Sequence, residues 1–149
     1  MRHSIIPAVA LLLESPDGKL FVGRRQNTGY HDGKLNLPAG HIDPNETPRQ
    51  ALVRECREEV GIELLGDALQ FVHVQYNRNL EREQDRTHYY FKISSEGLTP
   101  KNTEPEKCNE VLWVSPWECL DEFVPFMAAA LEAIGSGQVY SEYFDTTTG

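Results

Sequence analysis

The stretch that decides the fold is LNLPAGHIDPNETPRQALVRECREEVGI, residues 35–62. Its second half predicts a helix that begins after Thr47, a residue that can form a capping box with Gln50 three positions on. Pro48 would occupy the first helical position, where its missing N–H costs nothing, and Gly61 marks the expected end. The sequence therefore predicts a helix with defined ends directly after the loop PAG.

Three glutamates lie on one side of this predicted helix. Glu55, Glu58 and Glu59 are spaced i, i+3, i+4 and share one arc. The neighbouring apolar arc consists of Leu52, Val53, Cys56 and Val60. An acidic arc is usually only a solvated face, because like charges at i, i+4 cost about 0.2–0.5 kcal/mol per pair. The glutamates alone therefore do not demand a metal.

Two features beside the acidic arc favour a metal site. The glycine of Pro38-Ala39-Gly40 permits close backbone approach, so carbonyl oxygens of this loop can join the carboxylates. An all-oxygen shell of this kind suits Mg²⁺ or Mn²⁺. Arg54 precedes Glu55 and can hold a carboxylate in one orientation through a bidentate bond.

The segment resembles the signature of the Nudix hydrolases, G-x5-E-x7-R-E-U-x-E-E-x-G-U, in which U is a bulky aliphatic residue. The matching positions are Gly40, Glu46, Arg54, Glu55, Cys56, Glu58, Glu59, Gly61 and Ile62. The one departure is Cys56, and a buried free cysteine behaves as a small hydrophobe. The flanking segments 27–30, 37–41 and 104–108 look like those of a bacterial MutT-like subgroup. The resemblance covers most of residues 5–134.

The resemblance implies hydrolysis of a nucleoside diphosphate linked to a further group X. It implies that Glu55, Glu58 and Glu59 hold the catalytic metal, with the carbonyl of Ala39 completing a site. Mg²⁺ is the expected cofactor and Mn²⁺ an alternative. Glu55 is also a candidate general base, and Arg54 should orient the glutamates. The remaining signature positions, Gly40, Glu46 and Gly61, are expected to support and orient these groups.

Further candidates lie outside the signature. Several Nudix enzymes take an extra ligand or base from a later loop, for which Glu104 and Glu106 are the candidates here, with Glu110 behind them. Arg24 and Arg25 end a predicted strand, where they are either solvated or bound to phosphate oxygens.

Aromatic and histidine side chains are the candidates for contacts to the rest of the substrate. Tyr30 and His31 lie in a glycine-containing loop that opens toward the signature. His73, Tyr76 and Tyr90 could line a pocket for the base, although aromatic residues in strands more often belong to the core.

Three functions are consistent with the sequence. The first is a MutT-like hydrolase that cleaves an ordinary, oxidised or non-standard nucleoside triphosphate to monophosphate and pyrophosphate. The second is a Nudix hydrolase of ADP-ribose, a nucleotide sugar or a dinucleoside polyphosphate. The small size of the chain favours the first. The third is a non-catalytic nucleotide-binding module, which would be expected to have lost signature glutamates, and none is lost here.

Amino-acid composition limits the classes of molecule that the chain is expected to bind. The chain has 149 residues, with 23 acidic against 14 basic side chains and a net charge of −9. This balance disfavours a nucleic-acid polymer, which needs a basic footprint, and favours a small nucleotide bridged by metal. No apolar run approaches the ~20 residues of a membrane span, so no membrane partner and a cytoplasmic location are expected. A homodimer is left open.

The order of predicted elements is mixed α and β in one layered domain. Strands are expected over 5–13, 19–25, 35–37, 62–65, 69–76, 88–93 and 111–114, and helices over 116–120 and 124–134 besides the signature helix. The first two strands should form a hairpin, and 77–86 a charged loop. With the resemblance, the expected fold is a Nudix-type α/β/α sandwich with a mixed sheet. The domain should span 1–134, and 135–149 should form a C-terminal tail.

Overall fold

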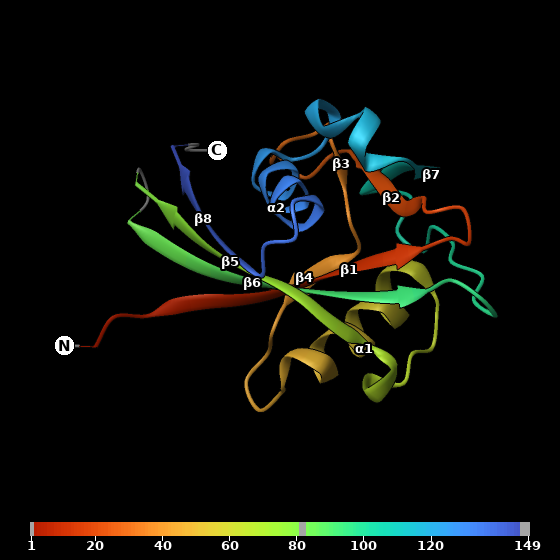
Figure 1. The fold of residues 1–149 in the computed structure, drawn as a ribbon, viewed down its shortest axis with the longest axis horizontal. Coiled ribbons are helices and arrows are strands. Elements are labelled where there is room, and N and C mark those ends of the chain that lie inside the picture. The colour runs from red at the N-terminus through yellow and green to blue at the C-terminus, as the bar shows by residue number, and fades with distance from the viewer. Residues whose placement is uncertain (1, 81–82, 147–149) are drawn as a thin grey trace.

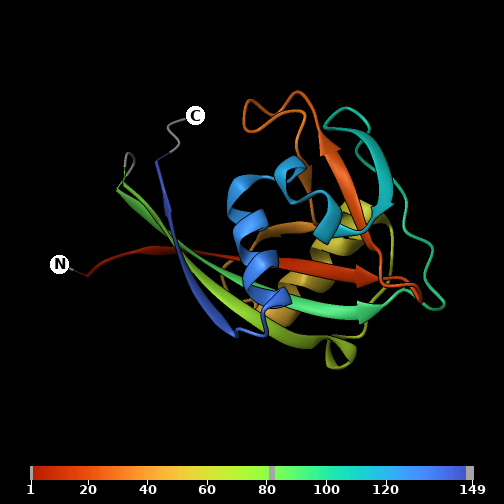
Figure 2. The ribbon, with the colours of Figure 1, turned by 45° about the horizontal axis from the view of Figure 1, so that its top comes forward.

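A mixed β-sheet between two helices forms the fold in the computed structural model, which describes residues 2–80 and 83–146 (Figure 1). Helix α1 spans Pro48–Val60 and covers one face, and helix α2 spans Pro125–Gly135 and covers the other. Figure 2 shows α2 lying across one face of the sheet, while the C-terminal strand runs along the edge of the sheet. The α/β/α sandwich predicted from the sequence is confirmed.

Eight strands make the sheet in the described residues. They are β1 Ile5–Glu14, β2 Leu20–Arg25, β3 Leu35–Asn36, β4 Ala39–His41, β5 Gln70–Asn79, β6 Gln84–Ser94, β7 Cys108–Val114 and β8 Tyr140–Asp145. Their order is β3-β2-β1-β6-β5-β8, while β4 pairs with β1 and β7 with β2. The pairs β1–β6 and β5–β8 are parallel and the others antiparallel. Short 3₁₀ turns occur at η1 Gly66–Ala68, η2 Pro116–Glu118 and η3 Leu120–Glu122.

Strand β1 is buried on both faces, as its apolar run predicts. Val9 and Leu11 belong to the core under α1, and Ala10 and Leu12 to the core under α2. Side chains alternate between the two faces of a strand, so a single strand supplies both cores. The sheet is thereby held between two apolar layers, and α1 cannot move without disturbing β1.

The ends of α1 are those that the sequence predicts. The Thr47 side chain accepts from Gln50 N–H, and Gln50 in turn accepts from Thr47 N–H. Gly61 ends the helix with φ +66°, a conformation that favours glycine. Cys56 is fully buried in the apolar arc, where burial raises the pKa of its thiol.

Several predicted elements differ in the structure. Residues 62–65 form no strand, and β2 pairs with β1 only at Glu14↔Leu20, so the expected hairpin is almost open. Strand β2 pairs along its length with β7 instead, because the chain between β1 and β2 diverges after one pair. The expected loop at 77–86 is mostly strand, since β5 reaches Asn79 and β6 begins at Gln84; residues 81–82 lie outside the described part.

The tail expected for 135–149 is wrong over residues 140–145, which form β8. Strand β8 pairs in parallel with β5 from Val74↔Tyr140 to Asn79↔Asp145. His73 fixes its start, because Nδ1 donates to Gln138 O at 2.9 Å and Nε2 lies 2.7 Å from Ser141 Oγ. Residues 147–149 lie outside the described part of the chain, and the domain boundary at 134 stays a prediction.

In the described ranges, the helices are all too short or too polar to cross a membrane.

Candidate active site

The loop Pro38-Ala39-Gly40 and helix α1 meet where the signature glutamates point. Strand β4, which the sequence did not predict, pairs Gly40 with Val9 of β1 and so fixes this loop to the central sheet. Ala39 N–H donates to Glu59 Oε2 at 3.3 Å. A Cβ on Gly40 would lie 2.1 Å from Glu55 Cδ, so only glycine leaves room for this carboxylate. The backbone and two of the three predicted ligands are therefore brought together.

Burial and crowding disfavour the charged form of Glu59. Glu59 is half-buried, and its pKa is raised well above the ordinary value because removal of the carboxyl group from water disfavours the charged form. The negative charges of Glu55 and Glu104 raise it further, as does a hydrogen bond to the Glu55 carboxyl. Carboxylates that can ionise together only at high cost are stabilised by a divalent cation. An all-oxygen donor set of this kind fits the metal that Nudix hydrolases use.

Arg54 organises the glutamates, as predicted. Its guanidinium binds both oxygens of Glu46, with Nε to Oε2 at 2.7 Å and Nη2 to Oε1 at 2.9 Å. Nη1 donates to Glu55 Oε1 at 2.9 Å, and Nη2 also donates to His41 O at 3.1 Å. The pKa of Glu46 falls to about 2, first because of Arg54 and then because Asp43 N–H donates to it. Glu46 is therefore a positioning carboxylate held by Arg54.

Glu58 differs from the other two glutamates. Its carboxylate faces Arg54 at 3.4 Å and its side chain is 57% exposed, against 16% for Glu55. Within residues 2–80 and 83–146, no group of three or more acidic, histidine or cysteine side chains is placed so that it could hold a metal ion by itself. Mg²⁺ in enzymes commonly keeps several waters and binds one or two carboxylates plus substrate phosphate. The arrangement suits such an open site, with Glu58 at its edge.

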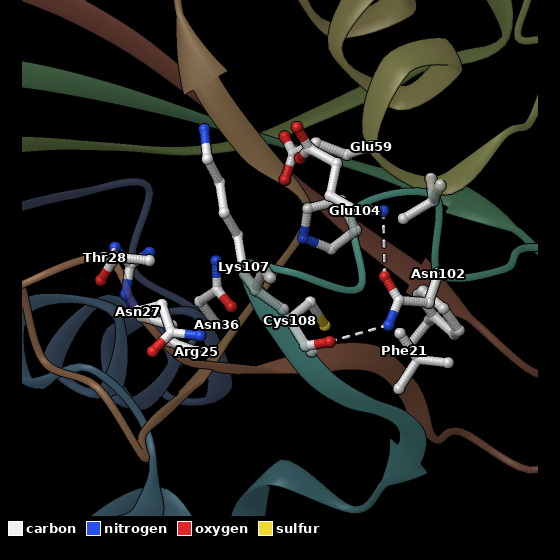
Figure 3. A pocket seen from close by; sticks show the side chains of 15 residues that line it. Phe21, Arg25, Asn27, Thr28, Asn36, Glu59, Asn102, Glu104, Lys107 and Cys108 are labelled. Carbon is white, nitrogen blue, oxygen red and sulfur yellow. Dashed lines mark hydrogen bonds between the residues drawn. The ribbon is translucent and has the colours of Figure 1, made fainter.

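Glu59 lies between two cavities. The first has a volume of about 380 Å³ and also contacts Arg25, Glu104 and Lys107 (Figure 3). In Figure 3 the carboxylates of Glu59 and Glu104 lie at one end of this cavity, and the Lys107 side chain extends toward that end. The second cavity has a volume of about 240 Å³ and begins at Glu59, Ala39 and Gly40. A substrate bound at Glu59 can therefore extend in two directions.

The candidates outside the signature are only partly brought to these cavities. Glu104 lines the first cavity, whereas Glu106 does not, and Glu110 instead pairs with Arg24 at 2.8 Å. Arg24 also contacts Gly33 O and Glu122, so its guanidinium stabilises the strand end away from the site.

Arg25 is the arginine that lies at the site. It lines both cavities and is held by Tyr30 O at 2.8 Å and Thr28 Oγ1 at 3.1 Å. Its guanidinium also lies 5.6 Å from the centre of the Tyr30 ring. Tyr30 lines the second cavity. His31 packs edge-on against the Tyr30 ring and does not line that cavity.

The pocket expected from His73, Tyr76 and Tyr90 is not formed. His73 and Tyr90 are fully buried between the sheet and α2, and Tyr76 binds Asp85 at 2.5 Å near the hairpin end. The physical reason is strand alternation, which places these side chains in the core or away from the metal site.

Sequence reasoning missed Arg86, His88 and Phe126, which line the second cavity. The His88 and Phe126 rings lie 4.5 Å apart at 30° and form part of its wall. Arg86 was hidden because 77–86 was expected to be a loop. No alternation over Asp85–Thr87 marked this part of the strand in the sequence.

His88 makes the stability depend on pH. Its pKa falls to about 3 because burial disfavours the imidazolium, and the charge of Arg86 adds to this. Below pH 6.5 the unfolded chain binds a proton at this residue that the folded chain does not. The free energy of unfolding therefore decreases as the pH is lowered. We expect the free energy of unfolding to lose about 1.4 kcal/mol per pH unit from this residue between pH 6 and 4. Urea denaturation should show a shallower acid slope for His88→Gln, and an identical slope would contradict this assignment.

Comparison with known proteins identifies the family of this chain. The sequence model of the NUDIX domain matches residues 5–134. An RNA pyrophosphohydrolase of Saccharophagus degradans is 30% identical over 96% of this chain and 92% of its own length. The 8-oxo-dGTP diphosphatase of Escherichia coli is 41% identical over 34% of this chain and 40% of its own. The crystal structure of a MutT protein from Methanosarcina mazei superposes with a TM-score of 0.74, covering 91% of this chain and 96% of that one, at 20% identity. The chain therefore belongs to the Nudix family and is a MutT-like hydrolase with pyrophosphohydrolase chemistry.

Proposed function

We propose that this chain hydrolyses a nucleoside triphosphate, ordinary, oxidised or non-standard, to the monophosphate and pyrophosphate. The observation that carries the proposal is the position of Glu59, half-buried beside Glu55 and shared by two cavities. Arg25 lines both cavities, and Lys107 adds a second cation to the first, which suits phosphate oxygens. The other has the rings of His88 and Phe126 and suits a nucleoside.

The metal in this proposal is Mg²⁺, with Mn²⁺ as an alternative, held by Glu55, Glu59 and the Ala39 carbonyl with Glu58 at the edge. When bound, such an ion neutralises the phosphate charge and lowers the pKa of bound water. Arg54 keeps the Glu55 carboxylate in place from its far side. Substrate phosphate and water would supply further oxygen ligands to such an ion.

The chain's own residues perform the remaining steps. Water attacks the phosphorus next to the nucleoside, a new P–O bond forms, and the anhydride P–O bond breaks as pyrophosphate leaves. A carboxylate accepts the proton of this water, with Glu104 and Glu55 as the candidates. Glu104 lies in the same cavity as Glu59, and no ion pair in the described residues engages its carboxylate. Arg25 and Lys107 line the same cavity as Glu59 and would neutralise the charge of the leaving pyrophosphate.

A second candidate substrate is a pyrophosphate linkage on RNA. The relative that supports it is the RNA pyrophosphohydrolase that aligns with 96% of this chain. The net charge of −9 disfavours a long polyanion, because nucleic-acid affinity depends on basic side chains that neutralise phosphates. ADP-ribose, nucleotide sugars and dinucleoside polyphosphates remain the alternative small substrates, and a non-catalytic module is the remaining alternative.

A substrate panel tests this proposal. It contains ordinary and oxidised triphosphates, ADP-ribose, a nucleotide sugar, a dinucleoside polyphosphate and a triphosphorylated oligoribonucleotide, each with Mg²⁺ or Mn²⁺. We expect the highest kcat/KM for a triphosphate, with monophosphate and pyrophosphate resolved by chromatography. Preference for another class by more than about 10-fold would transfer the assignment to that class, and silence throughout, with no metal bound, would support the non-catalytic module.

A further inference from the structure

The 240 Å³ cavity, whose wall includes the rings of His88 and Phe126, shares lining residues with a smaller cavity that reaches the C-terminal strand. Tyr30, Arg86, His88 and Phe126 line both the 240 Å³ cavity and a smaller one of about 20 Å³. Asp145 of β8 also lines the smaller cavity, together with Asn77 and Asn79 of β5. A continuous path of lining residues therefore runs from the metal site to β8.

The pairing of β8 with β5 fixes the position of the Asp145 backbone. It pairs with Asn79 in the register of β5 and β8, and its carbonyl accepts from Leu80 N–H at 3.0 Å. The residue is only 6% exposed. Its negative charge also reaches His31, where it opposes the fall in pKa that burial causes. Strand β8 lies beyond the residues 5–134 that match the family model.

We propose that Asp145 is a specificity-determining residue that accepts a hydrogen bond from the exocyclic amino group of the substrate base. This inference rests on the proposed function, because it requires that the base enter the aromatic cavity. An ionised carboxylate only accepts hydrogen bonds and offers about four lone-pair positions, so an existing partner leaves room for another. A carbonyl oxygen at the same place would meet a negative oxygen and be rejected.

The sizes of the two cavities agree with this arrangement. The larger one has the walls that a flat ring needs, including the ring of Phe126 against His88. The smaller one, at about 20 Å³, has room for a group the size of one water or amino group and not for a ring. An exocyclic substituent is the part of a base that fits there. Bases with an amino group should therefore bind better than their counterparts without one.

The test compares nucleotides that differ in this one group, namely CMP with UMP, AMP with IMP, and GMP with IMP. Their affinities are measured by calorimetry on the full chain with Mg²⁺, which does not depend on turnover. The kcat/KM values of the corresponding triphosphates are measured alongside. We expect the wild-type chain to prefer the amino member of at least one pair by about 10-fold or more.

Asp145→Asn should reduce or reverse that preference, because an amide can donate to a carbonyl oxygen. Glu142→Gln is the matched control, since it makes the same change on an exposed residue of β8 and should keep the wild-type ratio. A purely structural role for Asp145 would weaken both members of a pair equally. The ratio therefore separates base reading from loss of structure.

The inference would be overturned by no preference in the wild-type chain, by an unchanged ratio in Asp145→Asn, or by an equal loss for both members. A failure of the proposed function has a different signature. In that case the triphosphates are not cleaved while the monophosphates still bind with a preference that Asp145→Asn changes. Absence of monophosphate binding by the wild-type chain would also overturn the inference.

Discussion

Glu59→Gln is expected to lower kcat by about 10³-fold or more, which corresponds to about 4 kcal/mol of lost transition-state stabilisation. The glutamine keeps the shape of Glu59 but cannot supply a negative ligand at the point where both cavities meet. The variant should fold normally, because the raised pKa shows that the metal-free site favours a neutral side chain at this position.

Two measurements separate the chemical role of Glu59 from a structural one. Thermal unfolding without metal should give a Tm equal to or above that of the wild-type chain, and the rise in Tm on adding Mg²⁺ should shrink. Glu63→Gln is the control, because Glu63 is exposed and pairs with Arg57 outside the site. If the Glu59→Gln variant kept the wild-type kcat, Glu59 would have no role in catalysis.

Gly40→Ala is expected to lower kcat by about 10²-fold, since the added methyl must displace the Glu55 carboxylate from beside the Ala39 loop. The new Cβ would lie 2.1 Å from Glu55 Cδ and 2.4 Å from its Oε1, which is closer than nonbonded atoms can approach. Movement of this carboxylate also breaks its 2.9 Å bond with Arg54. The effect should therefore appear in kcat and in metal affinity together.

The control for this substitution is Gly66→Ala in η1. Its added methyl would meet its nearest neighbour, Arg49 Cβ, at 3.7 Å, which is an ordinary contact. We expect this control to keep wild-type kcat. A Gly40→Ala variant with unchanged kcat and unchanged metal affinity would mean that the Glu55 carboxylate is not needed where the structure places it.

Local chemistry explains why the signature region could be predicted. The cap at Thr47, the stop at Gly61 and the acidic arc depend on residues within one helix, and all three are found in the structure. Arg54 was correctly expected to orient Glu55, because the two are adjacent in sequence. The buried strand β1 was visible from its apolar run alone.

Long-range pairing explains what the sequence did not show. Strand β8 follows a polar, glycine-containing segment, and its place is set by pairing with β5, more than 60 positions earlier. The walls of the second cavity come from β6 and α2, so His88 and Phe126 meet only in the folded chain. Arg24 and Arg25 looked equivalent in the sequence. In the structure Arg24 pairs with Glu110, whereas Arg25 lines the cavity at the site.

The most direct test of the central claim is the ³¹P NMR spectrum of a nucleoside triphosphate incubated with the chain, with Mg²⁺ and then with excess chelator. The account predicts monophosphate and pyrophosphate with Mg²⁺, and no hydrolysis after chelation. A diphosphate with inorganic phosphate would place the attack at the wrong phosphorus and contradict the arrangement of the two cavities about Glu59. Hydrolysis that persists with chelator would contradict the role assigned to the glutamates.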